Sequence, residues 1–203
     1  QPIEQEAQLR LLEKLKNHAH HRSLLALRPA DSAETTVAWK MALENRQTPT
    51  GLILSRQGIK DLPAAGESRY QEALASERGG YIVQDCQGKA DVVLLANGSE
   101  VATLVEGSHL LEADGIKTRI VSVPSEGRFR DQDISYQHAI LPAGIPRFGM
   151  TAGLPVNLEG LVGENGKVFG LEHFGYSAPY QVLDEKFGFT GENVYQQVKA
   201  LLA

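Results

Sequence analysis

The cationic residue best placed for ligand chemistry is Arg56, in the run Leu54-Ser55-Arg56-Gln57. It follows an apolar stretch, residues 50–55, that predicts a short buried strand. In open α/β sheets ligands bind beyond the carboxyl ends of strands, where a guanidinium can hold a phosphate or a carboxylate. The alternative is an arginine paired with a neighbouring acid at a domain edge, because surface arginines greatly outnumber ligand arginines. Position alone leaves both interpretations open.

Three histidines, His18, His20 and His21, cluster before the first expected strand. Two histidines two residues apart could share a metal ion on an extended segment. No nearby carboxylate or cysteine has convincing ligand spacing, however. We therefore expect a solvated loop here and no metal site.

A glutamate–histidine pair, Glu172-His173, follows an expected strand over residues 167–171. Such a pair could exchange protons with a substrate. A catalytic pair also needs a third group that orients it, and none can be named. Structural polar contacts are the expected role.

The turn Asn97-Gly98-Ser99-Glu100 joins an expected strand to an expected helix. Turns of this kind can bind phosphate on the free N–H groups of the helix. This one lacks the three-glycine fingerprint, and Glu100 would repel a phosphate while stabilising the helix dipole. Helix capping is the expected role.

The remaining candidate nucleophiles are Ser125, Ser177 and the single cysteine, Cys86. Neither serine lies in a Gly-x-Ser-x-Gly motif or has a base partner that can be named. A lone cysteine excludes an internal disulfide framework and a multi-cysteine zinc site, and we expect a packed thiol. The residues alone thus give one phosphate-holding candidate, Arg56, and no complete catalytic set.

Composition sets the broad class of the protein. The chain has 203 residues, is 42% hydrophobic and carries a formal net charge of -5, which is ordinary for a globular protein. There is no clustered basic face for nucleic acid, no apolar run that could span a membrane and no signal peptide. We therefore expect neither nucleic acid nor membrane as a partner, and a cytoplasmic location.

The elements that must position Arg56 form a first α/β block. A strand is expected over residues 23–27, followed by the turn Arg28-Pro29-Ala30-Asp31. Asp31 and Glu34 form an acidic variant of a capping box, so a helix should begin near Ser32. Its apolar face comprises Val37, Ala38, Met41 and Ala42. With the strand over residues 50–55 this makes one right-handed βαβ unit.

A connector over residues 57–78 separates this unit from a second α/β block. Strands are expected there over residues 81–84, 91–96, 118–123, 146–150 and 167–171. A helix after Glu100 should bury Val101, Leu104, Val105, His109 and Leu111, and two closing helices should lie within residues 178–187 and 190–202. The order of elements predicts a three-layer α/β/α domain with a mostly parallel, mixed sheet.

The start of the chain carries a helical pattern whose apolar positions, Leu11, Leu12 and Leu15, need a partner to cover them. The chain has no initial methionine, and one βαβ unit cannot cover both faces of its own sheet. Both observations favour a piece of a longer protein.

Several stretches, in order along nearly the whole chain, resemble transketolase. They are Gln1-Pro2-Ile3-Glu4-Gln5, Arg28-Pro29-Ala30-Asp31 with Glu34, residues 49–57 ending in Leu-Ser-Arg-Gln, Gly79-Gly80-Tyr81, Gly98-Ser99-Glu100-Val101 and Phe187-Gly188-Phe189-Thr190. The resemblance implies that residues 1–57 are the end of the pyrimidine-binding domain, 58–78 a linker, and 79–203 the C-terminal domain.

The same resemblance implies an activity, the transfer of a two-carbon ketol unit between ketose and aldose phosphates. It implies thiamine diphosphate with Mg²⁺ or Ca²⁺ as cofactors, and a homodimer, in the full-length enzyme. Arg56 matches the arginine that binds the sugar phosphate. The groups that bind and activate the cofactor would lie outside this chain, so no catalytic, cofactor-binding or metal-binding residue and no bound cofactor are expected in it, and the chain alone is expected to be inactive.

Some positions depart from the family, including Leu27, Asn97 and the stretch 148–170. Two alternatives therefore stay open. One is a related thiamine-dependent enzyme, a deoxyxylulose-phosphate synthase or a 2-oxo-acid dehydrogenase subunit. The other is a non-catalytic module for dimer assembly or regulation.

Overall fold

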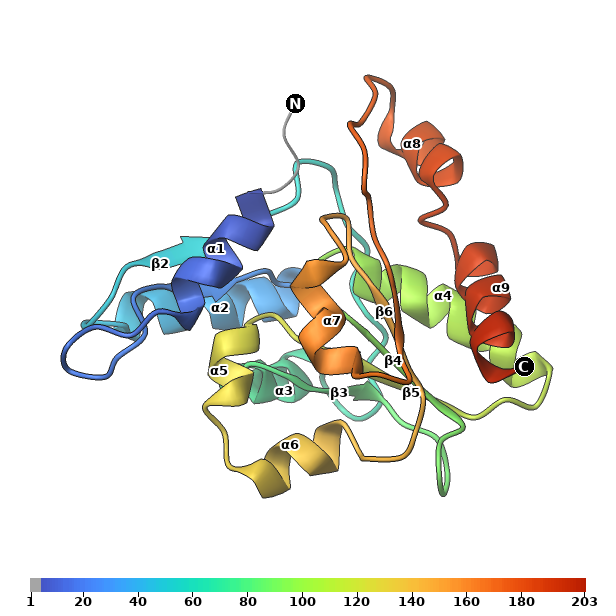
Figure 1. Ribbon diagram of the computed structural model, residues 1–203, viewed down its shortest axis with the longest axis horizontal. Helices are drawn as coiled ribbons and strands as arrows, with labels where there is room; N and C mark the ends of the chain where they lie inside the picture. The colour runs from blue at the N-terminus through green and yellow to red at the C-terminus, as the bar shows by residue number, and fades with distance from the viewer. Residues whose placement is uncertain (1–4) are drawn as a thin grey trace.

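The computed structural model describes residues 5–203, so residues 1–4 of the Gln1–Gln5 stretch lie outside it. Two sheets organise the chain (Figure 1). The first part of the chain contains α1 (Gln5–Lys14), β1 (Leu25–Leu27), α2 (Ser32–Glu44), β2 (Thr50–Leu52), α3 (Arg69–Ala73) and the 3₁₀ helix η1 (Leu74–Arg78). The second contains β3 (Tyr81–Gln84), β4 (Val92–Ala96), α4 (Glu100–Ala113), β5 (Thr118–Ser122), α5 (Glu126–Arg130), α6 (Ile134–Ile140), β6 (Arg147–Met150), α7 (Val156–Val162), β7 (Lys167–Phe169), α8 (Tyr180–Phe187) and α9 (Gly191–Leu202).

The smaller sheet is the predicted βαβ unit. Strands β1 and β2 are parallel, with Leu25 opposite Thr50 and Leu27 opposite Leu52. Helix α2 begins at Ser32 because Asp31 accepts a hydrogen bond from the Glu34 N–H at 2.8 Å, as predicted. Its buried face packs on the end of β1 through Leu27, Val37, Ala38 and Met41.

Strand β2 differs from the prediction in length and burial. It ends at Leu52 rather than Ser55, its residues are only half-buried, and Leu54 is exposed. One reason is that β1 is its only strand neighbour among residues 5–203, so one edge of β2 is unpaired in this part of the chain. An apolar composition alone does not reveal which side of a strand is covered.

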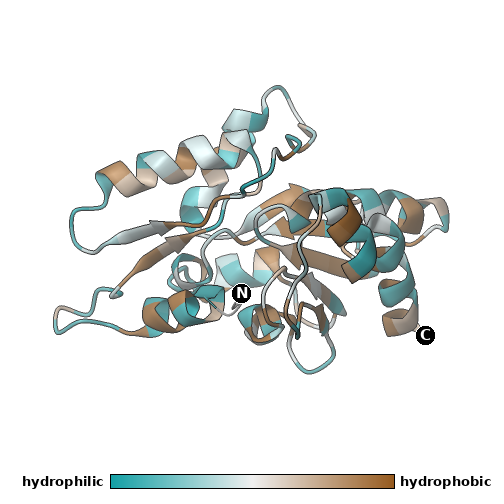
Figure 2. Cartoon of the chain, turned by 90° about the horizontal axis from the view of Figure 1, so that it is seen from above, coloured by the Kyte–Doolittle hydropathy of each residue, from teal (hydrophilic) through white to brown (hydrophobic). Residues whose placement is uncertain are grey.

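The larger sheet has the order β3-β5-β4-β6-β7, with β3 antiparallel and the other neighbours parallel. Side chains alternate between its faces, because successive residues of a strand point to opposite sides. On β4, Val92, Leu94 and Ala96 pack with α4 and α9, whereas Val93 and Leu95 pack with α5, α6 and α7. The α/β/α sandwich with a mostly parallel sheet is therefore confirmed, and Figure 2 shows its central strands coloured as hydrophobic.

Several short helices were not expected from the sequence: α3, η1, α5, α6 and α7. Each is five to seven residues long, too short to show a clear apolar period. Two of them lie in the connector, which is therefore structured over residues 69–78. The placement of His109 on the buried face of α4 was wrong, because the face follows Leu104, Ser108 and Leu111 and leaves His109 exposed.

Helix α1 buries two charged residues and exposes two leucines, and a third exposed leucine follows the helix directly. Arg10 and Glu13 are buried, whereas Leu11, Leu12 and Leu15 are 63%, 47% and 58% exposed. The apolar stripe predicted here is thus uncovered by residues 5–203. No helix in this range is both long and apolar enough to cross a membrane.

Candidate functional site

Arg56 lies on an exposed loop beyond the carboxyl end of β2. The strand ends four residues before it, so the arginine does not sit directly at the strand end as predicted. None of the ion pairs formed between residues 5–203 involves Arg56. An exposed guanidinium in this place is available to an anionic ligand.

The loop that carries Arg56 is held at one end by the last residue of β1 and at the other by the start of α2. At the start, the Ile53 N–H donates to the Leu27 carbonyl oxygen at 2.8 Å. At the far end, the Leu62 N–H donates to Asp31 Oδ2 at 3.2 Å, and the Ser32 N–H donates to Asp61 Oδ1 at 3.0 Å. Residues 54–60 therefore span two fixed points.

Asp31 belongs to a buried ionic cluster with Arg69, Glu34 and Tyr81. Arg69 Nε donates to Asp31 Oδ2 at 2.7 Å, and its Nη2 lies 3.4 Å from Glu34 Oε1. Tyr81 Oη donates to Glu34 Oε1 at 2.7 Å. Burial raises the pKa of the Tyr81 hydroxyl, with Glu34 adding to it, so the group stays protonated and can donate. The cluster joins α2 to α3 and to β3 of the larger sheet.

The turn after β4 is filled by a side chain from the first block. Arg28 Nη1 donates to the Asn97 carbonyl oxygen and to Asn97 Oδ1, each at 2.7 Å, and forms an ion pair with Glu100. Burial opposes the Arg28 charge, but Glu100 and Glu6 outweigh it and raise the pKa of the guanidinium. Glu100 thus neutralises Arg28 rather than only stabilising the helix dipole. The turn that the sequence offered as a phosphate site therefore holds an ion pair.

A third cluster joins α1 to the same interface. Arg10 lies 3.3 Å from Glu13 and 3.4 Å from Glu6. Ser125 Oγ donates to Glu13 Oε1 at 2.6 Å and also accepts from the Arg128 N–H at 3.3 Å as the N-cap of α5. Ser125 is therefore a buried capping residue with a carboxylate partner, and within residues 5–203 its recorded side-chain hydrogen bonds involve no histidine or lysine side chain.

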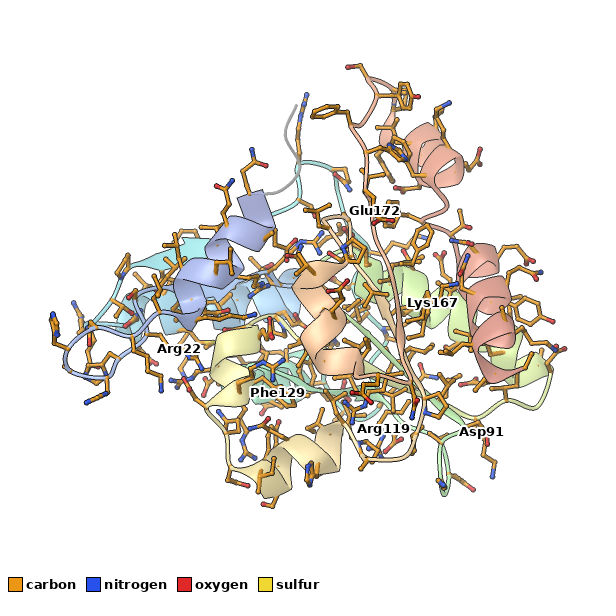
Figure 3. The ribbon with its side chains drawn as sticks, in the orientation of Figure 1. Arg22, Asp91, Arg119, Phe129, Lys167 and Glu172 are labelled. Carbon is orange, nitrogen blue, oxygen red and sulfur yellow. The ribbon has the colours of Figure 1, made fainter. Side chains whose placement is uncertain are left out.

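The histidine segment forms a tight loop. Lys16 pairs with Arg22 across it, and Asn17 Oδ1 accepts the N–H groups of Ala19 and His21. His20 and His21 line a cleft of about 380 Å³ that also includes Arg22, bound to Asp131 at 2.6 Å; Figure 3 labels Arg22. Among residues 5–203 no group of three or more His, Cys, Asp and Glu side chains is arranged to hold a metal ion.

Within residues 5–203, none of the recorded hydrogen bonds or ion pairs joins the other sequence candidates to Arg56. Glu172 and His173 are exposed on the stretch between β7 and α8, where Figure 3 labels Glu172. The ring of His173 packs against Phe187, with 5.4 Å between centroids, and its Nδ1 lies 2.9 Å from the Phe174 carbonyl oxygen. Ser177 is exposed in a loop, and Cys86 is half-buried and free. None of them joins a catalytic set.

Sequence reasoning missed the buried ion pairs that join the two blocks and hold the far end of the Arg56 loop. Arg28 and Asp31 belonged to a quoted motif but were interpreted as a turn and a helix cap. Arg69 gave no signal, because its partners are 35 and 38 residues away in the chain. Buried ion pairs of this kind become visible only when the two blocks are packed together.

The sequence of this chain is similar to a protein-family model and to individual proteins of known family. Residues 79–190 match the family model described as Transketolase-like TK C-terminal domain. Over 204 aligned residues the chain is 41% identical to Transketolase 2 of Vibrio parahaemolyticus and 40% identical to Transketolase 1 of Escherichia coli K12. In both cases it is covered completely and spans 29% of the relative's length.

Solved structures agree with the sequence comparison. The crystal structure of a transketolase from Pichia stipitis in complex with sedoheptulose-7-phosphate superposes on the whole chain with a TM-score of 0.84 and 32% identity. The chain covers 27% of that protein.

Proposed function

Since the chain belongs to the transketolase family, we propose that it supplies the C-terminal part of a transketolase. The complete enzyme would transfer a two-carbon ketol unit between ketose and aldose phosphates. In this part of the enzyme, Arg56 binds the phosphate of the sugar. The observation that carries the proposal is the position of Arg56, an exposed cation on a loop with both ends anchored, beyond the carboxyl end of a parallel strand.

Phosphate binding suits the chemistry of this side chain. A guanidinium stays charged and presents parallel N–H donors that match two oxygens of a phosphate. The phosphate of a sugar is remote from its carbonyl carbon, so its binding energy orients the reacting end without taking part in bond making. The complex of the Pichia stipitis enzyme with a sugar phosphate supports this substrate class.

Thiamine diphosphate and a divalent cation are the cofactors that the family implies. Residues 5–203 contain no cluster of His, Cys, Asp and Glu side chains that fits a metal ion. We propose that both cofactors bind to parts of the enzyme outside this chain, as the resemblance to the family implies. The ketol-transfer chemistry would belong to thiamine diphosphate, whereas this chain holds the far end of the substrate.

The organisation of the parent enzyme follows from the same family membership. We propose that residues 1–57 end the pyrimidine-binding domain, that 58–78 join the domains, and that 79–203 form the C-terminal domain. We also propose a cytoplasmic homodimer. The uncovered leucines of α1 support assembly with further protein, because exposed apolar stripes of this kind mark contact surfaces.

The test is replacement of Arg56 by alanine in the complete enzyme. The KM for a phosphorylated ketose should rise, whereas the kinetics with unphosphorylated fructose should stay the same. Equal KM values for fructose 6-phosphate before and after the change would exclude the phosphate-binding role.

A further inference from the structure

We propose that Asp31 and Arg69 are positioning residues for the Arg56 loop, and that they set the affinity for the phosphate of the substrate. The inference rests on the proposed function of Arg56. It assigns a role to a buried ion pair that does not touch the ligand.

The two carboxylate oxygens of Asp31 accept hydrogen bonds from different parts of the chain. Oδ1 accepts the Glu34 N–H at 2.8 Å and caps α2. Oδ2 accepts the Leu62 N–H at 3.2 Å and Arg69 Nε at 2.7 Å. Helix capping needs only the first of these, so the second oxygen is free to hold the end of the loop that starts at Ile53.

Arg69 fixes the orientation of the Asp31 carboxylate. Its guanidinium contacts Asp31, Glu34 and Tyr81 together, and its side chain is 11% exposed. The fork geometry of arginine allows these contacts at once, whereas a lysine ammonium is a single point charge on a flexible stem. Arg69 thus keeps Oδ2 turned toward the loop.

The anchor at Asp31 in turn restricts the position of Arg56. Residues 54–60 contain no helix or strand, so their conformation depends on the anchors at Ile53 and at Asp61–Leu62. Leu62 is also 4% exposed and packs in the core of the larger sheet. If the anchor at Leu62 is released, the loop gains conformations in which Arg56 is misplaced, and phosphate affinity falls.

Asp31→Asn is the sharpest variant for the test. Asparagine caps helices as well as aspartate does, so α2 can still begin at Ser32. Its amide NH₂ would face two donors, the Leu62 N–H and Arg69 Nε, and would release both. Arg69→Lys is the conservative variant, which keeps the charge and loses the fork.

Lys40→Met is the matched control. Lys40 pairs with Glu77 and so joins α2 to η1, but it is exposed, and its recorded ion pairs within residues 5–203 are with Glu44 and Glu77 and not with the Arg56 loop. Its removal should leave the loop unchanged.

The experiment uses the complete enzyme with fructose 6-phosphate and with fructose as ketol donors. For Asp31→Asn we expect a roughly 3- to 10-fold higher KM for fructose 6-phosphate, kcat within about twofold, and an unchanged KM for fructose, which is the size of effect expected when one net hydrogen bond is lost. Arg69→Lys should give a smaller rise and Lys40→Met none. Hydrogen exchange of the N–H groups of residues 54–60 should be faster in Asp31→Asn.

The inference is overturned if Asp31→Asn changes the KM of both donors equally, or changes neither. If Asp31→Asn does not fold, Arg69→Lys decides by the same comparison. Arg56→Ala separates the two proposals. If it raises the KM for fructose 6-phosphate and Asp31→Asn does not, only the positioning role fails; if Arg56→Ala has no effect, the phosphate-binding role itself fails.

Discussion

The guanidinium of Arg28 occupies the space beside Gly98 where any other residue would place a Cβ atom. A Cβ built on Gly98 would lie 2.6 Å from Arg28 Cζ, and the glycine has a φ of +61°. The close approach lets Arg28 reach both oxygens of Asn97 and the carboxylate of Glu100. One glycine therefore permits the ion pair that joins the two blocks of the chain.

We predict that Gly98→Ala lowers the free energy of unfolding by about 2–5 kcal/mol. About 1–2 kcal/mol comes from the left-handed backbone conformation and about 1–3 kcal/mol from displacement of Arg28. Denaturant unfolding measures the change. Gly115→Ala is the matched control, because Gly115 has a φ of +78° and no atom within 4 Å of its built Cβ, so only the backbone cost applies. Equal losses in the two variants would contradict the role assigned to Arg28.

A second glycine, Gly107, sets the distance between α4 and α9. A Cβ on Gly107 would lie 2.5 Å from Val194 Cγ1. Gly107→Ala should destabilise by up to about 2 kcal/mol, since overpacking costs about 1–3 kcal/mol and helix propensity returns about 1 kcal/mol. Adding Val194→Ala removes the clash, so the double variant should be more stable than the sum of the single changes. Strict additivity in thermal and denaturant unfolding would show that the two helices move apart without cost.

Replacement of Arg56 should follow the chemistry of the side chain. A hydrogen bond to a charged group contributes about 1.5–3 kcal/mol, so Arg56→Ala should raise the KM for fructose 6-phosphate by about 10- to 100-fold. The KM of Arg56→Lys should lie between those of the original enzyme and of Arg56→Ala, because lysine keeps the charge but loses two-point recognition of the phosphate. Steady-state kinetics of the complete enzyme give both values. A lysine variant as poor as the alanine variant would mean that geometry, and not charge, determines the affinity.

Glu34 should make the folding stability of the protein depend measurably on pH. Burial raises its pKa above the ordinary value of 4.5, only partly offset by its hydrogen bonds. The folded protein therefore binds a proton more tightly than the unfolded chain does. The stabilisation from this group is complete below about pH 4.5 and is lost as the pH rises through the pKa of the folded state.

The test compares the melting temperature of the original protein with that of Glu34→Gln at several pH values from 4 to 8. The neutral amide cannot titrate, so the advantage of glutamate over glutamine should shrink as the pH rises. Glu44→Gln, an exposed change on the same helix, should show no such trend. If the stability advantage of glutamate over glutamine grew with pH, the pKa of Glu34 would be lowered in the folded protein, and the prediction would be wrong.

Ser125 should matter for stability and not for the reaction. Ser125→Ala removes the N-cap of α5 and the hydroxyl donor to Glu13. The expected loss is about 1–2 kcal/mol in the free energy of unfolding, with unchanged ketol transfer in the complete enzyme. Ser177→Ala, at an exposed position, should change stability by less than about 0.5 kcal/mol. Lost activity with full stability would restore Ser125 as a candidate nucleophile.

Much of the fold could be predicted from local signals. The cap at Asp31, the cap at Thr190 and the apolar runs of β4 and β5 give their elements correctly, because capping and periodicity depend on neighbouring residues. The short helices α5, α6 and α7 escaped prediction, since so few residues carry no clear period. The burial of the 50–55 stretch was wrong for a related reason: an apolar sequence does not say whether another layer lies over it.

The sequence by itself determined the order of the two α/β blocks, the ends of the main helices and the presence of an arginine after β2, all of which depend on residues close together in the chain. Only the tertiary structure decided what Arg28, Asp31, Glu34 and Arg69 do. Their partners lie in other elements, and a buried charge is tolerated only where packing brings an opposite charge within reach. The same packing anchors both ends of the loop that carries Arg56.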